Sequence, residues 1–282
     1  MGSARTLLFT TIAMLAFAGN SLLCRLALKH TSIDPASFTS LRLLSGAIAL
    51  AVIVRLRSDG GADGRGSWPS ALALVAYAAC FSFAYVELPA AAGALLLFGA
   101  VQATMIGTGL WRGERLGRIE WAGLAIALAG LVGLLLPGLS APPWRGSLLM
   151  LAAGAAWGVY SLRGKGAGDP TRVTAGNFLL ALPFALLLSA VGWRQAVPDA
   201  SGAIYAVASG ALASGIGYAV WYTALRGLNA TRASVVQLSV PALTAIGGVL
   251  FIGEAITARL MLASAAILGG VALVIVQRGR RA

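Results

Sequence analysis

The sequence predicts an all-α integral membrane protein, with ten transmembrane helices arranged as two inverted five-helix repeats. Of its 282 residues, 59% are hydrophobic and 11% are charged, and the mean hydropathy is +0.85. A soluble domain carries about 25% charged residues, and a chain this apolar would expose large apolar patches to water. Each span needs roughly 20 apolar residues. Ten spans therefore leave only short connectors and no second, soluble domain.

The first half of the chain holds five apolar runs of spanning length. We expect helices at residues 6–28, 36–56, 68–88, 90–110 and 118–136. The first run follows Arg5 as the apolar part of a signal peptide would, but no small-residue cleavage site and polar mature domain come after it. We therefore interpret it as the first helix. Breakers rich in Gly and Pro follow the second and fifth runs, SDGGADGRGS at 58–67 and PGLSAPP at 137–143.

The second half repeats this plan. We expect helices at residues 146–164, 172–191, 201–225, 230–251 and 259–276. Pro241 falls inside the fourth of these runs and removes the hydrogen bond to the carbonyl of Gln237, four residues earlier. In a membrane that carbonyl needs another partner, either a polar cavity or a neighbouring Ser or Thr. Gly154 and Gly158 form a GxxxG pattern, which predicts a close contact between helices.

The distribution of Lys and Arg predicts which end of the bundle faces the cytoplasm. With the N-terminus inside and ten alternating helices, 15 of the 21 Lys and Arg residues fall on the inner side, 5 on the outer side, and Arg42 within a span. Basic residues collect on cytoplasmic loops, so we expect both termini in the cytoplasm. The net charge of +12 follows from this topology, and we do not expect nucleic acid as a partner.

The chain repeats itself at offsets of 135 to 140 residues. Three matches occur in the same order: DPASFTSLRLL from Asp34 with DPTRVTAGNFLL from Asp169, YVEL at Tyr85 with YTAL at Tyr222, and RGERL around Glu114 with IGEAI around Glu254. In the first match, Arg42 aligns with Asn177. Each half, 1–137 and 145–282, holds five helices. Because five is an odd number of spans, the second half starts on the other side of the membrane and must be inverted relative to the first. Inverted repeats are typical of secondary transporters, which open alternately to either side of a midplane site.

Longer stretches of both halves resemble a known family. The segments FAGNSLLCRLALKH and DPASFTSLRLL, then ALLLFGAVQATMIGTGLWRGERLGRIEWAGLAIALAGLVGLLLPG, and in the second half VVQLSVPALTAIGGVLFIGEAI, are similar to the paired EamA-type domains of the drug/metabolite transporter superfamily. The resemblance covers essentially the whole chain. It implies that helices 1–4 and 6–9 surround a central cavity, with helices 5 and 10 packed outside. One departure is that Val101 stands where the second half has Pro241.

Arg42 is the strongest candidate for contact with a substrate. It lies about seven residues into the second expected helix, roughly 10 Å below the outer surface at 1.5 Å per residue. A cation at that depth is costly, and intramembrane ionisable groups are candidates for function. Its guanidinium could hold the carboxylate of an amino acid through two hydrogen bonds. Alternatively, it could extend to the outer headgroups or bind neighbouring backbone carbonyls.

Amides and aromatic rings within the spans complete the candidate substrate-binding set. The amides are Asn20, Gln102, Asn177 and Gln237, each of which could instead bridge helices for about 1 kcal/mol. Aromatic residues share helical faces as Tyr77, Phe81 and Tyr85, as Trp157 and Tyr160, and as Tyr218 with Trp221 or Tyr222. Such stripes usually serve packing, but phenol and indole groups in a bilayer need polar partners. We expect Tyr77, Tyr85, Trp157, Tyr218 and Trp221 to line one central cavity.

Several functional classes lack the residues they need. The sequence has one His, no HExxH motif, no P-loop and no acidic cluster, so we expect neither an enzyme nor a metal or cofactor. No Asp or Glu falls at the middle of a span, where proton-coupled carriers and cation pumps usually place one. The resemblance implies export of amino acids, including aromatic ones, or related small metabolites across the bacterial inner membrane. We expect the protein to be a monomer. A multidrug or organic-cation exporter is one alternative, and a channel-like pore is another.

Overall fold

The computed structural model describes residues 3–57, 64–138, 141–164, 168–228 and 230–281, which form a helical bundle without a strand in these ranges. The first half consists of α1 (Ser3–His30), α2 (Pro35–Leu56), α3 (Trp68–Glu87), α4 (Ala90–Trp111) and α5 (Arg118–Leu135). The second half consists of α6 (Trp144–Arg163), α7 (Pro170–Val191), the 3-10 turn η1 (Trp193–Gln195), α8 (Ala200–Val207), the π-helix η2 (Ala208–Ile216), α9 (Gly217–Leu225), α10 (Ala230–Gln237), α11 (Ser239–Ile252) and α12 (Ala258–Arg281).

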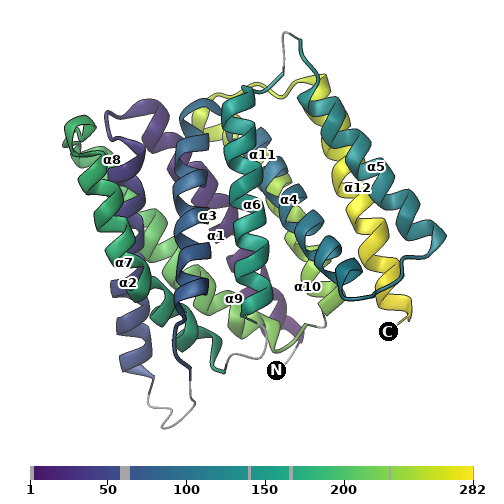
Figure 1. Cartoon of the computed structure of the whole chain (residues 1–282), viewed down its shortest axis with the longest axis horizontal. Coiled ribbons are helices and arrows are strands. Elements are labelled where there is room, and N and C mark those ends of the chain that lie inside the picture. Colours follow the sequence, from purple (N-terminus) through teal and green to yellow (C-terminus); the bar gives the residue numbers. More distant parts are fainter. Residues whose placement is uncertain (1–2, 58–63, 139–140, 165–167, 229, 282) are drawn as a thin grey trace.

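The expected all-α membrane fold is confirmed, with two refinements. The eighth span is one continuous segment, α8, η2 and α9, whose middle is π-helical. The ninth span is divided into α10 and α11 at Leu238, three residues before Pro241. Nine of the described helical segments are long and apolar enough to cross a membrane. The expected sixth span corresponds to α6, which has 20 residues and packs against both α3 and α4 (Figure 1).

The second helix of each half begins in the same way. The side chain of Asp34 accepts hydrogen bonds from the backbone N–H groups of Ala36 and Ser37 at the start of α2. Asp169 accepts one from the N–H of Arg172 at the start of α7. A proline follows each aspartate, where its missing N–H costs no hydrogen bond. The matched segments of the two halves thus produce matched helix starts.

Helices of the two halves alternate in space. α2 packs on α7, α3 on α6, and α1 on α9 and α11, while α4 packs on both α6 and α11. A Cβ at Gly154 would lie 2.5 Å from the carbonyl oxygen of Leu97, and one at Gly158 would lie 2.8 Å from Thr104 Cβ. The expected GxxxG contact is therefore the one between α6 and α4. α5 and α12 pair with each other at the edge of the bundle (Figure 1), as the family resemblance implied.

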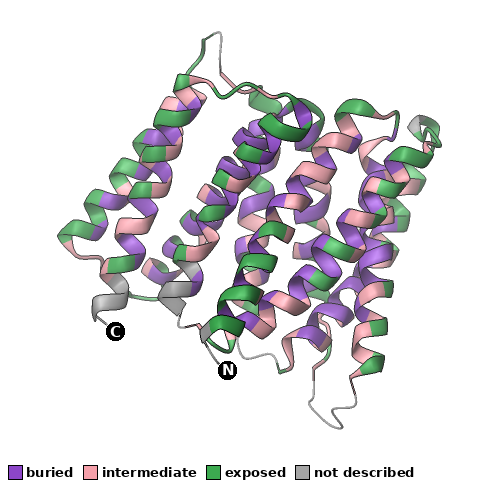
Figure 2. Ribbon diagram, turned by 180° about the vertical axis from the view of Figure 1, so that it is seen from behind, coloured by how far each residue is buried: buried purple, intermediate pink, exposed green. Residues whose placement is uncertain are grey.

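The start of α1 and the end of α12 lie at one end of the bundle, together with the end of α2 and the start of α3 (Figure 1). We call this the terminal end, and the other the opposite end. Large apolar side chains are exposed along the outer helix faces, among them Leu186, Phe251 and Leu262, while buried residues face inward (Figure 2). Such a surface suits acyl chains and would be unstable in water. The ten helices therefore enclose a core from both halves in a shell suited to lipid.

Candidate functional site

Arg42 lies inside the bundle and is only 2% exposed. Its Nη2 donates to the hydroxyl oxygen of Tyr77 at 3.0 Å, and its Nε donates to Ser214 Oγ at 3.4 Å. Its Cζ lies 5.1 Å from the ring centre of Tyr77 and 4.9 Å from that of Phe81, so the cation also contacts two aromatic faces. Nη1 has no hydrogen-bond partner among the described residues. In this conformation Arg42 neither extends to the headgroups nor donates to backbone carbonyls.

The contacts of Arg42 belong to a closed ring of polar side chains. Asn20 Nδ2 donates to the hydroxyl oxygen of Tyr77 at 3.2 Å, and the hydroxyl of Ser209 donates to Asn20 Oδ1 at 2.7 Å. Ser209 and Ser214 both belong to the π-helix η2. The ring therefore passes from η2 through α1, α3 and α2 and returns to η2. The ring links four helical segments from both halves, and Arg42 itself binds the uncharged oxygens of Tyr77 and Ser214.

The π-helix explains how two serines five residues apart join one ring. In an α-helix of 3.6 residues per turn, such residues point about 140° apart. A π-helix bonds residue i to residue i+5 and therefore places them on one face. The sequence Ser-Gly-Ala-Leu-Ala-Ser-Gly from Ser209 to Gly215 has this period of five. This five-residue period is the feature of the sequence that could have indicated that both serines share one face. It was not used when the span 201–225 was predicted as an α-helix.

The glycines of this repeat let η2 approach α2 closely. A Cβ at Gly210 would lie 2.1 Å from the carbonyl oxygen of Arg42 and 2.1 Å from Ser45 Oγ, far inside contact distance. A Cβ at Gly215 would lie 2.9 Å from Ala49 Cβ. Each glycine follows one of the ring serines in sequence. The same five-residue period thus supplies both the close backbone contact and the hydroxyl groups.

A central cavity lies beside the polar ring. Its volume open to the centres of water molecules is about 30 Å³, whereas one water needs about 10–15 Å³ and ligand pockets measure about 300–1,000 Å³. Trp157 packs between Tyr77 and Tyr218, at ring-centre distances of 4.8 and 5.3 Å, and Phe17 packs against Tyr218 at 5.9 Å. The space between the rings would hold two or three waters. In this conformation it is too small for a metabolite.

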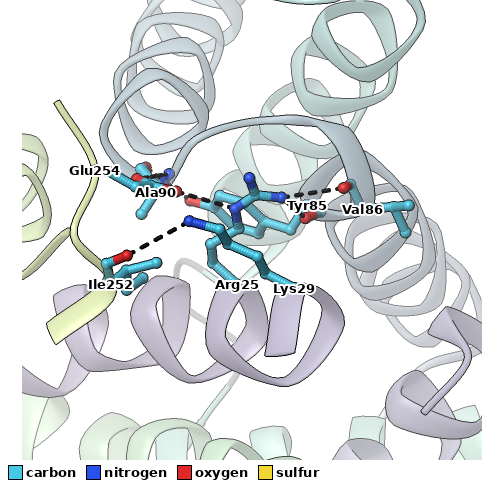
Figure 3. A network of polar contacts seen from close by, with 7 residues as sticks. All are labelled: Arg25, Lys29, Tyr85, Val86, Ala90, Ile252 and Glu254. Carbon is cyan, nitrogen blue, oxygen red and sulfur yellow. Dashed lines mark hydrogen bonds and ion pairs between the residues drawn. The ribbon is translucent and has the colours of Figure 1, made fainter. Parts of the chain in front are cut away.

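An ion pair links helix ends at the opposite end of the bundle (Figure 3). Arg25 Nε on α1 lies 3.0 Å from Glu254 Oε1 in the connection after α11, and both side chains are about 10% exposed. Arg25 Nη1 also donates to the carbonyl oxygens of Tyr85 and Val86 at the end of α3. Glu254 Oε2 accepts the N–H of Ala90, the first residue of α4, at 2.7 Å. One ion pair thus connects the ends of four helices.

Polar contacts near the terminal end involve residues of α3, α6 and α7. Asn177 Oδ1 accepts the backbone N–H of Ser67 at 2.9 Å, and Asn177 Nδ2 donates to the hydroxyl oxygen of Tyr160 at 3.4 Å. Arg163 Nε donates to Ser70 Oγ at 3.2 Å. In the same region, Arg57 Nη1 lies 3.6 Å from Asp169 Oδ1. These contacts hold the start of α3 against the second half.

Comparison with known proteins decides the family. The model of the EamA-like transporter family matches residues 4–136 and again residues 144–276. The chain belongs to the EamA-like transporter family. The family domain is present twice, in agreement with the resemblance stated for the drug/metabolite transporter superfamily and with the internal repeat found in the sequence.

Individual relatives of this EamA-like protein differ in how much they cover. A Pseudomonas aeruginosa protein described as uncharacterized protein PA1977 is 58% identical over 100% of this chain and 98% of its own length. The threonine/homoserine exporter RhtA is 31% identical in Salmonella typhimurium and 30% in Escherichia coli, over 53% of this chain and 52% of each exporter. The match thus spans about half the length of these exporters. A crystal structure at 22% identity superimposes with a TM-score of 0.65 over 98% of this chain and 99% of that chain, which shows the fold alone.

The EamA-like fold brings five of the ten predicted site residues to the cavity wall, namely Asn20, Tyr77, Trp157, Tyr218 and Gln237. The other five lie elsewhere. Arg42 lies behind the rings of Tyr77 and Phe81, and Asn177 contacts the connection before α3. Tyr85 and Gln102 are buried away from the cavity wall, and Trp221 packs against Phe17. Tyr85 donates its hydroxyl to the carbonyl oxygen of Ala90 beside the ion pair of the opposite end.

Proposed function

We propose that this EamA-like protein exports small metabolites, above all amino acids including aromatic ones, across the bacterial inner membrane. In this proposal it is a monomeric secondary transporter whose two inverted repeats open alternately to either side, with both termini in the cytoplasm. Three facts support it. The family is a transporter family, the relatives of known role export threonine and homoserine, and the site lies where helices of both halves meet.

The observation that carries the proposal is the unsatisfied guanidinium of Arg42. A buried cation without an acidic partner is costly, and its Nη1 has no hydrogen-bond partner among the described residues. A carboxylate bound to Nη1 and Nη2 would supply both the missing charge and the missing acceptor through two parallel hydrogen bonds. In this conformation the rings of Tyr77 and Phe81 separate Arg42 from the cavity. A substrate therefore reaches Arg42 when Tyr77 moves aside as the helices part.

The aromatic wall supports broad specificity for the side chain of the substrate. The aromatic rings of the wall offer apolar contact area that does not depend on a specific hydrogen bond to the substrate. They belong to Phe17, Tyr77, Trp157 and Tyr218. Apolar contact contributes about 25 cal/mol per Å² buried, so substrates of different size bind with graded affinity. An organic cation fits less well, because the described cavity wall holds no Asp or Glu and Arg42 repels positive charge.

The proposal is tested by counterflow of labelled amino acids into proteoliposomes. We expect the purified protein to exchange internal for external amino acid with saturation, as a carrier does, and without the conductance of a channel. Arg42→Ala should abolish exchange of carboxylate-bearing substrates, and Arg42→Lys should retain part of it, because Lys keeps the charge but loses the planar fork. Arg145→Ala is the matched control, since Arg145 is exposed and lies over the Trp144 ring.

The outcomes separate the possible roles of Arg42. Normal exchange by Arg42→Ala, in protein that elutes as a single species, would show that Arg42 serves only to hold the helices together. Exchange of organic cations, with amino acids excluded, would replace the proposed substrate class. Conductance without exchange would indicate a channel.

A further inference from the structure

A groove lies between α2 and α7 near the terminal end, where α2 ends and α7 begins. The two helices pack side by side (Figure 1), and the space between them open to the centres of water molecules is about 530 Å³. This volume falls within the range of ligand pockets, about 300–1,000 Å³. We call this space the α2–α7 groove. Its apolar wall consists of Ala51 and Val54 on α2 and Ala175, Leu179 and Leu180 on α7.

Three arginines line the groove, and each comes from a different segment. Arg55 lies in the last turn of α2, Arg65 in the connection before α3, and Arg172 in the first turn of α7. Arg55 and Arg65 are exposed, and neither has a hydrogen bond or ion pair with another described residue. The described lining residues include no Asp or Glu.

The carboxylate of Asp169 lies next to the groove but is engaged elsewhere. Its Oδ1 lies 3.6 Å from Arg57 Nη1 and accepts the backbone N–H of Arg172 at the start of α7. Two other acids, Asp59 and Asp63, belong to the segment 58–63, which is outside the described residues. The described part of the groove is therefore basic.

Close backbone packing holds Arg65 beside the groove. A Cβ at Gly66 would lie 2.3 Å from the carbonyl carbon of Gly176, so the connection before α3 runs directly against α7. The N–H of Ser67 donates to Asn177 Oδ1 at 2.9 Å and fixes the same segment. Arg65 is thus placed by a fixed backbone next to the arginine of α7.

The polarity of the groove changes with depth. Leu179 follows Arg172 by seven residues, about 10 Å along α7 toward the middle of the bundle, and Ala51 precedes Arg55 by about one turn of α2. The arginines therefore lie at headgroup depth, and the apolar wall continues from them toward the bilayer core. A phospholipid has the same order of groups, with a phosphate at the surface and acyl chains below it. A soluble anion would use the arginines but not the wall.

Membrane orientation alone accounts for basic residues at a cytoplasmic end. It explains single arginines such as Arg112 and Arg115 after α4, but it does not require three arginines to meet on one apolar groove. Basic pockets between transmembrane helices bind anionic lipid headgroups. A guanidinium binds a phosphate through two parallel hydrogen bonds.

We propose that an anionic phospholipid binds in the α2–α7 groove, with its phosphate on the three arginines and an acyl chain along the apolar wall. The inference goes beyond the proposed export, and it depends neither on the substrate nor on which side of the membrane the terminal end faces. Because the arginines belong to α2, to the connection before α3 and to α7, the lipid bridges the two halves. Bound lipid therefore stabilises their contacts at the terminal end.

The test is lipid binding to the full-length protein in detergent, measured by native mass spectrometry and by the unfolding temperature. Dioleoylphosphatidylglycerol should bind and raise the unfolding temperature, whereas dioleoylphosphatidylcholine, whose headgroup has no net charge, should bind much more weakly. Arg55→Gln combined with Arg65→Gln should raise the half-saturating concentration of phosphatidylglycerol on the order of twentyfold, since each arginine near an anionic headgroup contributes about fivefold. Inorganic phosphate at the same concentrations should not protect the protein.

Matched variants separate the groove from general surface charge. Arg112→Gln combined with Arg115→Gln removes the same charge at the same end of the bundle, because both residues are exposed and lie outside the groove (Figure 1). Ala51→Phe fills part of the apolar wall and keeps every arginine, so it should also weaken binding of phosphatidylglycerol. Val52→Phe is its control, since Val52 is 47% exposed and does not line the groove. Each variant is compared with its own lipid-free unfolding temperature.

Each result decides the inference separately from the proposed export, because no transport is measured. Weaker binding in the two groove variants, with both controls unchanged, supports it even if amino acids are not exchanged. An equal loss in the variant of Arg112 and Arg115 would overturn it, since surface charge would then explain the binding. Equal binding of phosphatidylcholine, equal protection by inorganic phosphate, or no binding of phosphatidylglycerol to the unchanged protein would overturn it as well.

Discussion

Gly210→Ala tests whether the close contact between η2 and α2 holds the polar ring together. The added Cβ would lie 2.1 Å from the carbonyl oxygen of Arg42 and 2.1 Å from Ser45 Oγ. The first neighbour is backbone and cannot rotate away, so the helices must separate by roughly 1 Å to reach contact distance. The bond from Arg42 Nε to Ser214 Oγ is already 3.4 Å long and would break. Overpacking of this kind costs about 1–3 kcal/mol.

The assay compares thermal unfolding in detergent with counterflow in liposomes. We expect Gly210→Ala to unfold at a lower temperature and to lose most of its exchange activity, because Arg42 loses its partner on η2. Gly19→Ala is the matched control in α1, since nothing lies within 4 Å of a Cβ there and alanine favours a helix by up to about 1 kcal/mol. If Gly210→Ala unfolds and transports like Gly19→Ala, the close contact does not position Arg42 and the reasoning fails.

Two further predictions concern the cavity and the topology. Trp157→Ala should weaken the apparent affinity for aromatic amino acids more than for small ones, because Trp157 fills the wall between Tyr77 and Tyr218; one missing methylene changes selectivity by roughly 10–200-fold. Competition uptake with small, branched and aromatic amino acids measures this, and an equal effect on all three would contradict it. Reporter fusions after Arg65 and Arg281 should both indicate the cytoplasm, and a periplasmic signal from either would refute the proposed orientation.

The sequence predicted the helices well because a bilayer imposes a simple rule. Runs of about 20 apolar residues must be helical when no water is available to the backbone, and the observed spans begin and end within a few residues of the expected ones. The repeat was equally clear, since matching caps such as Asp34 and Asp169 stand beside prolines. The π-helix was not predicted, because an apolar run of this length indicates a span but not the hydrogen-bond period of its backbone. The five-residue repeat of Ser209 and Ser214 was visible in the sequence all the same.

The site was harder to predict than the helices. Helical spacing shows which residues share a face of a helix but not which other helix or cavity that face contacts. Tyr77 and Tyr85 share one face of α3, yet eight residues correspond to about 12 Å along a helix. Tyr77 lines the cavity, whereas Tyr85 lies beside the opposite-end ion pair. Arg25 and Glu254 are 229 residues apart in the sequence. Only the packing of α1 against α11 brings them together.

The inverted symmetry of the fold does not extend to the charge of the site. Arg42 on α2 corresponds to Asn177 on α7, and each donates to a tyrosine hydroxyl, Tyr77 and Tyr160 respectively. Only Arg42 is charged, and Asn177 is engaged with the backbone of Ser67. A carboxylate bound at the centre would therefore face the first repeat whichever end is open. If the helices exchange roles between states as proposed, the substrate keeps one orientation, because its proposed charged partner belongs to one half.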